Sequence, residues 1–180
     1  MTVTRYAART AAFAAAYLLA YWAGIPLAVL SPVAVAAVWM LAQGRWGLRR
    51  FDVITLATLT AASAIAHGAG MLMAFGLAAA VTLPAMIFAV LLERWLPGWW
   101  QGHGDRFRPR RTRLVRLAAV AALTAVTSVV LQAILSPEPS VYDVSLRLAR
   151  DVVTLLAVTL AGRALLRPRT PQRTGLTLVR

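Results

Sequence analysis

The chain has 180 residues, of which 60% are hydrophobic and 14% are charged, and its mean hydropathy is +0.70. A water-soluble domain has about 45–50% apolar and about 25% charged residues, and this chain has no cysteine, so its composition excludes an ordinary soluble enzyme, a disordered tail and a disulfide scaffold. A net charge of +13 would suggest nucleic-acid binding in a soluble protein, so the placement of the charges has to be followed along the chain.

Long uncharged stretches predict where the chain crosses a membrane. Residues 10–44, 53–92 and 117–137 contain no Asp, Glu, Lys or Arg. A bilayer core about 30 Å thick takes about 20 helical residues, so the first two stretches are each long enough for two spans and the third for one. Turn-forming residues divide the first stretch at Gly24, Pro26, Ser31 and Pro32 and the second at His67, Gly68 and Gly70.

The last apolar segment carries charge near both ends, because only 11 uncharged residues separate Asp151 from Arg163. Extended to residues 146–166 it reaches membrane length, and an amphipathic helix lying on the membrane surface is the alternative. For the first span, a cleaved signal peptide is the alternative to a retained helix. We therefore expect an all-α, polytopic membrane helix bundle of about six transmembrane helices, at residues 6–24, 32–44, 51–66, 71–92, 115–135 and 146–166.

The arginines orient this bundle. With six spans, the N-terminus, the second loop, the fourth loop and the C-terminal tail lie on one side, and together they hold 17 of the 19 arginines. Cytoplasmic loops concentrate basic residues, so we expect both termini in the cytoplasm and the chain in a cytoplasmic membrane. The predicted organisation is an integral-membrane domain over residues 1–167, followed at residues 168–180 by a basic tail or a linker to an output domain.

The fourth loop combines aromatic and basic residues. Tryptophan marks the interface between bilayer and water, and arginine binds anionic lipid headgroups. Nucleic-acid binding is the weaker alternative, since the basic patch directly follows a span and no nucleic-acid-binding fold accompanies it. We expect a lipid interface on the cytoplasmic side, formed by Trp95, Trp99, Trp100, Arg106, Arg108, Arg110 and Arg111.

A second group of polar residues is expected near the opposite, external face. His67 lies about 24 Å from the cytoplasmic end of its span, and Arg147, Arg150 and Asp151 enter the last span from outside. Ionisable groups at membrane depth usually face the bundle interior or water. The functional hypothesis is a sensing pocket in which an arginine holds an anion. The structural alternative is that His67 only ends its helix, and that Arg150 and Asp151 point about 100° apart and reach the surface separately.

Two further features lie in the first half of the chain. Asp52 opens the third predicted span, where a carboxylate favours a helix N-terminus by about 0.3–1 kcal/mol. Alanines recur every fourth residue in the first span, and such faces let helices approach closely. We expect this face to pack within the chain, with a homodimer as the alternative. The face consists of Ala7, Ala11, Ala12, Ala15, Ala16 and Ala20.

The order of these segments resembles the type-one membrane-associated sensor domains (MASE family) of bacteria. The stretches that carry the resemblance are RRFDVITLATLTAASAIAHG, LAAAVTLPAMIFAVLLERW, RTRLVRLAAVAALTAVTSVVLQAI and SLRLARDVVTLLAVTLAGRALL. The second predicted span departs from the family, since it keeps Ser31 and Pro32 but moves Trp39 and lacks an inner glycine. The resemblance implies an integral-membrane sensory module that acts on a diguanylate cyclase, kinase or related output domain.

No phosphate loop, metalloprotease motif, nucleophile elbow or paired-carboxylate constellation occurs, so we expect no catalytic activity, cofactor or metal in this chain. The expected function is detection of a cue and its relay to a cytoplasmic signalling domain, in cis or in trans. The alternatives are a six-span substrate-binding component of a vitamin-type transporter, and a structural protein without a ligand.

Overall fold

Six helices make up the part of the chain that the computed structural model describes, which is residues 3–27, 31–43, 49–97, 110–135 and 140–165. No strand occurs in these ranges. The expectation of an all-α protein is confirmed, and every predicted segment is helical. The helices are α1 (Val3–Leu27), α2 (Pro32–Gln43), α3 (Arg49–Ala66), α4 (Met71–Trp95), α5 (Arg110–Leu135) and α6 (Val141–Leu165).

Several helices extend beyond the predicted spans, and three of these extensions are the most informative. α1 continues to Leu27, through Gly24 and Pro26, which we expected in a turn. Pro26 lies in the last turn, so the hydrogen bond that it cannot donate is lost only at the end of the helix. α5 begins at Arg110 and α6 at Val141, about five residues earlier than predicted in each case. Charge excludes a residue from the bilayer core but not from a helix, and arginine has a high helix propensity.

The turn between α3 and α4 is where the sequence predicts it. The Ala69 N–H donates to the Ala64 carbonyl at 3.0 Å, and the Gly68 N–H donates to the Ile65 carbonyl at 2.9 Å. These two bonds form a Schellman motif, which requires a left-handed residue, and Gly68 supplies it with φ of +86°. His67 therefore lies at the C-terminal end of α3, just before Gly68, as the structural alternative for this residue predicts.

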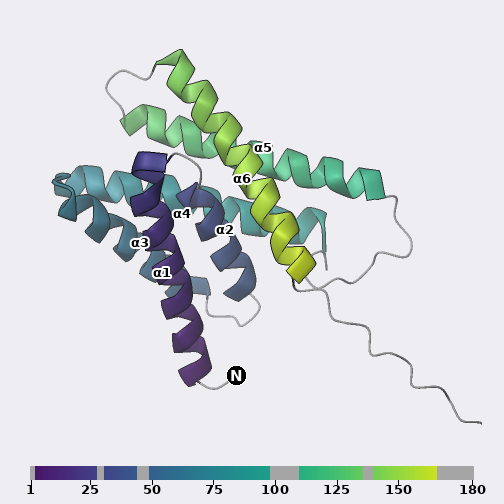
Figure 1. Ribbon diagram of the computed structural model, residues 1–180, viewed down its shortest axis with the longest axis horizontal. Coiled ribbons are helices and arrows are strands. Elements are labelled where there is room, and N and C mark those ends of the chain that lie inside the picture. The colour runs from purple at the N-terminus through teal and green to yellow at the C-terminus, as the bar shows by residue number, and fades with distance from the viewer. Residues whose placement is uncertain (1–2, 28–30, 44–48, 98–109, 136–139, 166–180) are drawn as a thin grey trace, which may run out of the picture.

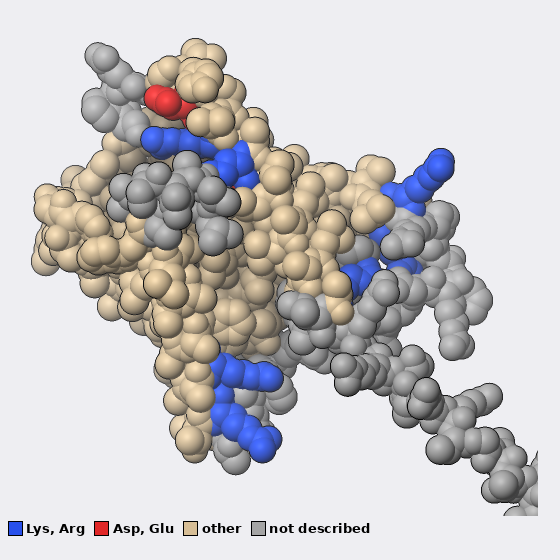
Figure 2. Space-filling view, viewed as in Figure 1, with Lys and Arg blue, Asp and Glu red and all other residues tan. Residues whose placement is uncertain are grey.

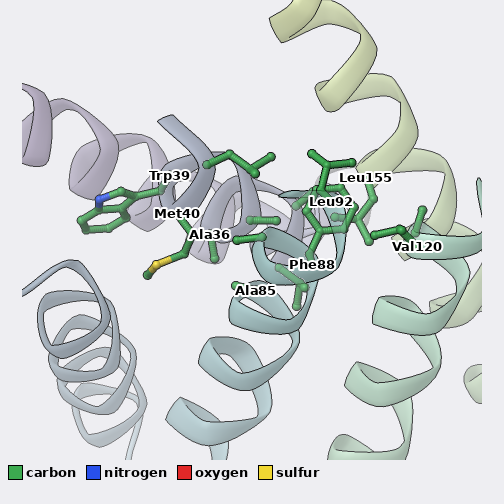
Figure 3. Packing of buried hydrophobic residues seen from close by; sticks show 14 of the residues in the cluster. Ala36, Trp39, Met40, Ala85, Phe88, Leu92, Val120 and Leu155 are labelled. Carbon is green, nitrogen blue, oxygen red and sulfur yellow. The ribbon is translucent and has the colours of Figure 1, made fainter. Parts of the chain in front are cut away.

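The core lies between α2, α4, α5 and α6. Eight of the twelve residues of α2 are buried, because this short helix is covered on most sides. Figure 3 shows Ala36 and Met40 of α2 facing Ala85 and Phe88 of α4, with side chains of α5 and α6 closing the far side. Small residues also bring α3 and α4 together, since Ala61, Ala64, Ala74 and Ala78 form a second buried cluster.

The alanine face of α1 does not pack in this way. Five of its six alanines are exposed, and only Ala20 is buried. The expectation that this face packs within the chain is therefore wrong. The buried side of α1 instead presents Tyr17 and Ala20, and the Tyr17 hydroxyl contacts that of Thr60 in α3. A homodimer through the alanine face stays a prediction.

The helix ends separate toward two sides of the molecule. In Figure 1 the start of α1 lies at the bottom and the end of α6 at the lower right of the helices, whereas the α3–α4 turn, the end of α5 and the start of α6 lie toward the left and upper left. Figure 2 shows basic side chains gathered at these extremities, with an uncharged surface between them on the visible face. The described helices also expose large apolar side chains, among which Leu72 is 89% and Ile134 is 74% exposed. Two helices, Met71–Trp95 and Arg111–Leu135, are long and apolar enough to cross a membrane.

Candidate functional site

A cavity of about 350 Å³ opens between the helices at the end of the molecule where α6 begins. This volume lies in the range of small-molecule binding sites, about 300–1,000 Å³. Each of the six helices contributes to its wall, so the cavity is a product of the whole bundle. It is lined by Tyr21, Ser31, Pro32, Val33, Thr60, Leu77, Ala80, Val81, Gln132, Arg147 and Arg150.

The depth of this arginine-lined pocket follows from helix geometry. Gln132 lies three residues before the end of α5, and Arg147 lies six residues after the start of α6. Arg150 lies nine residues after that start. At 1.5 Å per residue, these positions are about 4 to 14 Å from the helix ends. The pocket thus lies close to the face that the arginine distribution predicts to be external.

Arg147 is exposed at this pocket, and its Nη1 donates to Oε1 of Gln132 at 3.4 Å. Gln132 in turn donates through Nε2 to the hydroxyl of Ser128 at 3.3 Å. Ser128 and Gln132 are one turn apart on α5, so the amide is oriented from its own helix. The guanidinium keeps further N–H groups for a ligand, because it carries five donors in a planar fork.

Arg150 is half-buried and pairs with its neighbour Asp151. Its Nη2 lies 3.3 Å and its Nε 3.4 Å from Oδ1 of Asp151. The two side chains start in different directions, as expected, but the long arginine stem folds back and the guanidinium reaches the carboxylate. Asp151 is only 1% exposed, and its Oδ2 has no hydrogen-bond partner among the described residues. Of the two guanidinium groups that line the pocket, that of Arg150 thus pairs with a carboxylate and that of Arg147 bonds to a neutral amide.

Neutral polar groups complete the lining. The Ser31 hydroxyl is fully buried, lines the cavity and has no partner in the described part of the chain. Two guanidinium groups thus line one cavity, and guanidinium is the side-chain group that pairs with a carboxylate or phosphate through two parallel hydrogen bonds.

His67 does not line the pocket. Its ring contacts the rings of Tyr21 and Trp22, with centroid distances of 6.0 and 4.7 Å. Its Nδ1 lies 2.6 Å from the Ser63 carbonyl, and since a carbonyl only accepts, this nitrogen is the donor. Tyr21 lies between His67 and the pocket, since it contacts His67 and also lines the cavity. Of the four predicted site residues, Arg147 and Arg150 line the pocket, Asp151 pairs with Arg150, and His67 lies outside the lining.

The predicted lipid interface lies mostly outside the described residues. Trp99, Trp100, Arg106 and Arg108 fall there, and of Arg110 only the helical backbone is described. Trp95 is exposed at the end of α4, and its carbonyl accepts from Nη1 of Arg116 at 3.3 Å. Arg111 is exposed in the first turn of α5. The C-terminal end of α4 and the first turn of α5 thus both expose side chains of the kinds predicted for the lipid interface, Trp95 and Arg111 respectively.

Asp52 takes part in more than the helix end for which the sequence predicts it. It lies in the first turn of α3 and is fully buried. Its Oδ1 accepts from the Tyr6 hydroxyl at 2.9 Å and from Nε1 of Trp39 at 3.2 Å, while its Oδ2 has no partner among the described residues. Three helices therefore converge on one carboxylate. Nearby, Nε2 of Gln43 donates to the Thr10 hydroxyl at 3.1 Å. This bond joins α2 directly to α1, in addition to their shared contact with Asp52.

The buried pair of Tyr17 and Thr60 joins α1 to α3 behind the pocket, with 2.8 Å between their hydroxyl oxygens. We expect Tyr17→Phe to lower the free energy of unfolding by about 1 kcal/mol, because Thr60 loses this partner but keeps its bond to the Leu56 carbonyl. Equilibrium unfolding in mixed micelles measures the change. Tyr142→Phe, at an exposed position, is the control, and an equal cost for both variants would contradict this role of the pair.

No protein-family model, curated protein or solved structure matches this chain. Among the described residues, no group of three His, Asp or Glu side chains is placed to hold a metal ion. The functional argument therefore rests on the geometry of the arginine-lined pocket and on the charge pattern of the helices.

Proposed function

We propose that the chain is a six-span sensory module of a bacterial cytoplasmic membrane, in which the arginine-lined pocket binds a small anion and α6 relays its occupancy to a cytoplasmic output domain. The observation that carries this proposal is the pocket itself. All six helices line it, and both of its charged side chains are on α6, the helix that leads to the C-terminal end of the described chain.

Helix length and surface support six spans. α1, α4, α5 and α6 each have 25 or 26 residues, or about 37 Å, which exceeds a bilayer core of about 30 Å. α3 is shorter than these four helices but close to the thickness of the bilayer core. The short α2 is enclosed by its neighbours and faces little lipid. The exposed apolar side chains of α4 and α5 have no place on a water-facing surface of this size. Arginines on the cytoplasmic side would bind anionic lipids, and we assign no role to nucleic acid.

The sensory part of the proposal needs two packings of α6 with different affinity for the anion. Arg147 bonds to α5 through Gln132, and Arg150 bonds within α6 to Asp151. An anion between the guanidinium groups would compete with both contacts, so its binding would change how α6 sits against α5. The resemblance to type-one membrane-associated sensor domains supports the same direction of signalling, from the external end of the bundle to the cytoplasm.

The first test is anion binding. We expect thermal unfolding of the purified chain in nanodiscs to shift upward with inorganic phosphate or with members of a panel of small mono- and dicarboxylates. In Arg147→Ala the apparent affinity should fall about tenfold, because one charge-assisted bond is lost at an exposed residue that the fold does not need. Arg5→Ala, an exposed arginine of α1, is the control. Equal shifts in all three proteins would contradict a role for the pocket.

The second test asks whether binding moves α6. Because the chain has no native cysteine, spin labels can be placed at Ala7→Cys and Ala164→Cys, both exposed near the cytoplasmic ends of α1 and α6. We expect the anion that stabilises the protein to change the distance between them by about 1–2 Å or more, the scale of helix shifts in switching proteins. An unchanged distance, together with accumulation of the anion in proteoliposomes, would favour the transporter function instead.

A further inference from the structure

An apolar groove of about 400 Å³ lies near the opposite end of the bundle from the arginine-lined pocket. Its walls are one face each of α3 and α4, because Arg50, Val53 and Ile54 are spaced i, i+3, i+4, and so are Met86, Ala89 and Val90. Met40 of α2 forms the floor and is 1% exposed. Ile54 and Val90 at the rim are 61% and 49% exposed, so the groove opens on the outer surface of the bundle.

The lining indicates what the groove takes. Every lining side chain is apolar except Arg50, so a small polar solute finds one charged contact and no other polar side chain. Arg50 is exposed in the first turn of α3, at the end that the arginine distribution places in the cytoplasm. If the bundle spans the membrane, the groove faces the acyl chains and Arg50 lies at the level of the headgroups.

The Arg50 guanidinium is available to such a headgroup. The closest acidic residue in sequence, Asp52, is fully buried and bonded to Tyr6 and Trp39, on the other side of α3. No carboxylate among the described residues pairs with Arg50. A phosphate diester binds guanidinium with two parallel hydrogen bonds. A headgroup without its own ammonium group adds no charge repulsion with Arg50, so an anionic lipid is favoured over a zwitterionic one.

We propose that this groove binds one anionic phospholipid, with its phosphate on Arg50 and part of an acyl chain between α3 and α4. The inference rests on the proposed membrane location but not on the arginine-lined pocket. Because the groove touches α2, α3 and α4 at their cytoplasmic ends, a bound lipid would hold these three helices together there.

Native mass spectrometry of the full chain, released from micelles with phosphatidylglycerol or phosphatidylcholine, tests the proposal. We expect preferential retention of one phosphatidylglycerol, reduced about fivefold in Arg50→Gln. Val90→Trp, which fills the groove from an exposed position, should reduce retention to a similar degree. Arg9→Gln, at an exposed arginine of α1 on the same side, should leave it unchanged.

Three outcomes would overturn the proposal: equal retention of the two lipids, equal losses in Arg50→Gln and Arg9→Gln, or full retention in Val90→Trp. The last would show that the headgroup binds without a chain in the groove. Far-ultraviolet circular dichroism of each variant confirms that it is folded. The lipid result is independent of the Arg147 and α6 experiments, because the groove and the arginine-lined pocket share no lining residue.

Discussion

Replacing Asp52 with alanine is expected to lower the free energy of unfolding by about 2–3 kcal/mol, the largest stability effect of a single polar substitution in this chain. The substitution leaves the Nε1 of Trp39, on a fully buried side chain, and the Tyr6 hydroxyl without their acceptor. A buried donor without a partner costs about 1–3 kcal/mol. Equilibrium unfolding in mixed micelles, followed by tryptophan fluorescence, measures the difference.

Two variants separate the hydrogen bonds that Asp52 accepts from the effect of a carboxylate at a helix N-terminus. Asp52→Asn keeps an acceptor oxygen at the same place, so we expect it to lose less than half as much. Asp143→Ala removes an exposed carboxylate from the first turn of α6 and tests the helix-end effect alone, about 0.3–1 kcal/mol. Equal costs for Asp52→Ala and Asp143→Ala would show that the contacts with Tyr6 and Trp39 do not stabilise the fold.

Asp151→Asn is expected to tighten anion binding in the arginine-lined pocket by about tenfold. The substitution removes the carboxylate that offsets Arg150 and keeps a neutral acceptor for it. A unit charge about 10 Å from the ligand contributes about 1–2 kcal/mol at an effective dielectric constant of about 20, which corresponds to a factor of about ten in affinity. The titration uses whichever phosphate or carboxylate probe stabilises the parent protein.

The direction of the change in anion affinity distinguishes two roles of Asp151. Asp143→Asn changes the same charge on the same helix at an exposed position two turns away, where solvent and salt screen it, so its affinity should stay within about twofold. Weaker or unchanged binding in Asp151→Asn would contradict the electrostatic account of the pocket. Weaker binding would also show that Asp151 acts by holding the Arg150 side chain in position.

The positions of the helices follow from the sequence because charge and turn residues are local signals. Gly68 and its neighbours specify the α3–α4 turn without help from distant residues, and the structure forms it there. Helix starts were harder to predict, since Arg110 extends α5 beyond the apolar segment. The uncharged interval shows where the chain can cross the membrane core, and it does not show where the helix begins.

The candidate site was predictable in part for the same reason. Arg147 and Arg150 are conspicuous because charged residues are rare near membrane spans, and they do line the pocket. Ser31 and Gln132 carry no such signal, because neutral polar residues on separate helices become neighbours only through packing. Asp52 was visible as a charge, but its partners Tyr6 and Trp39 lie 46 and 13 residues away and follow no sequence motif.

The membrane topology is the claim on which the sensory proposal, the external pocket and the lipid groove all depend. The absence of native cysteine allows a direct measurement with single-cysteine variants and a membrane-impermeant maleimide in spheroplasts. Ser140→Cys precedes α6 and Gly70→Cys precedes α4, where an added side chain meets open space. Thr4→Cys, in the first turn of α1, and Pro97→Cys, after α4, are exposed and both lie at the other end of the bundle.

We predict that the maleimide labels the cysteines at positions 140 and 70 in intact spheroplasts, and those at positions 4 and 97 only after the membrane is permeabilised. Labelling of position 4 or 97 from outside, or protection of position 140 until permeabilisation, would contradict a six-span bundle with cytoplasmic termini and an externally open pocket.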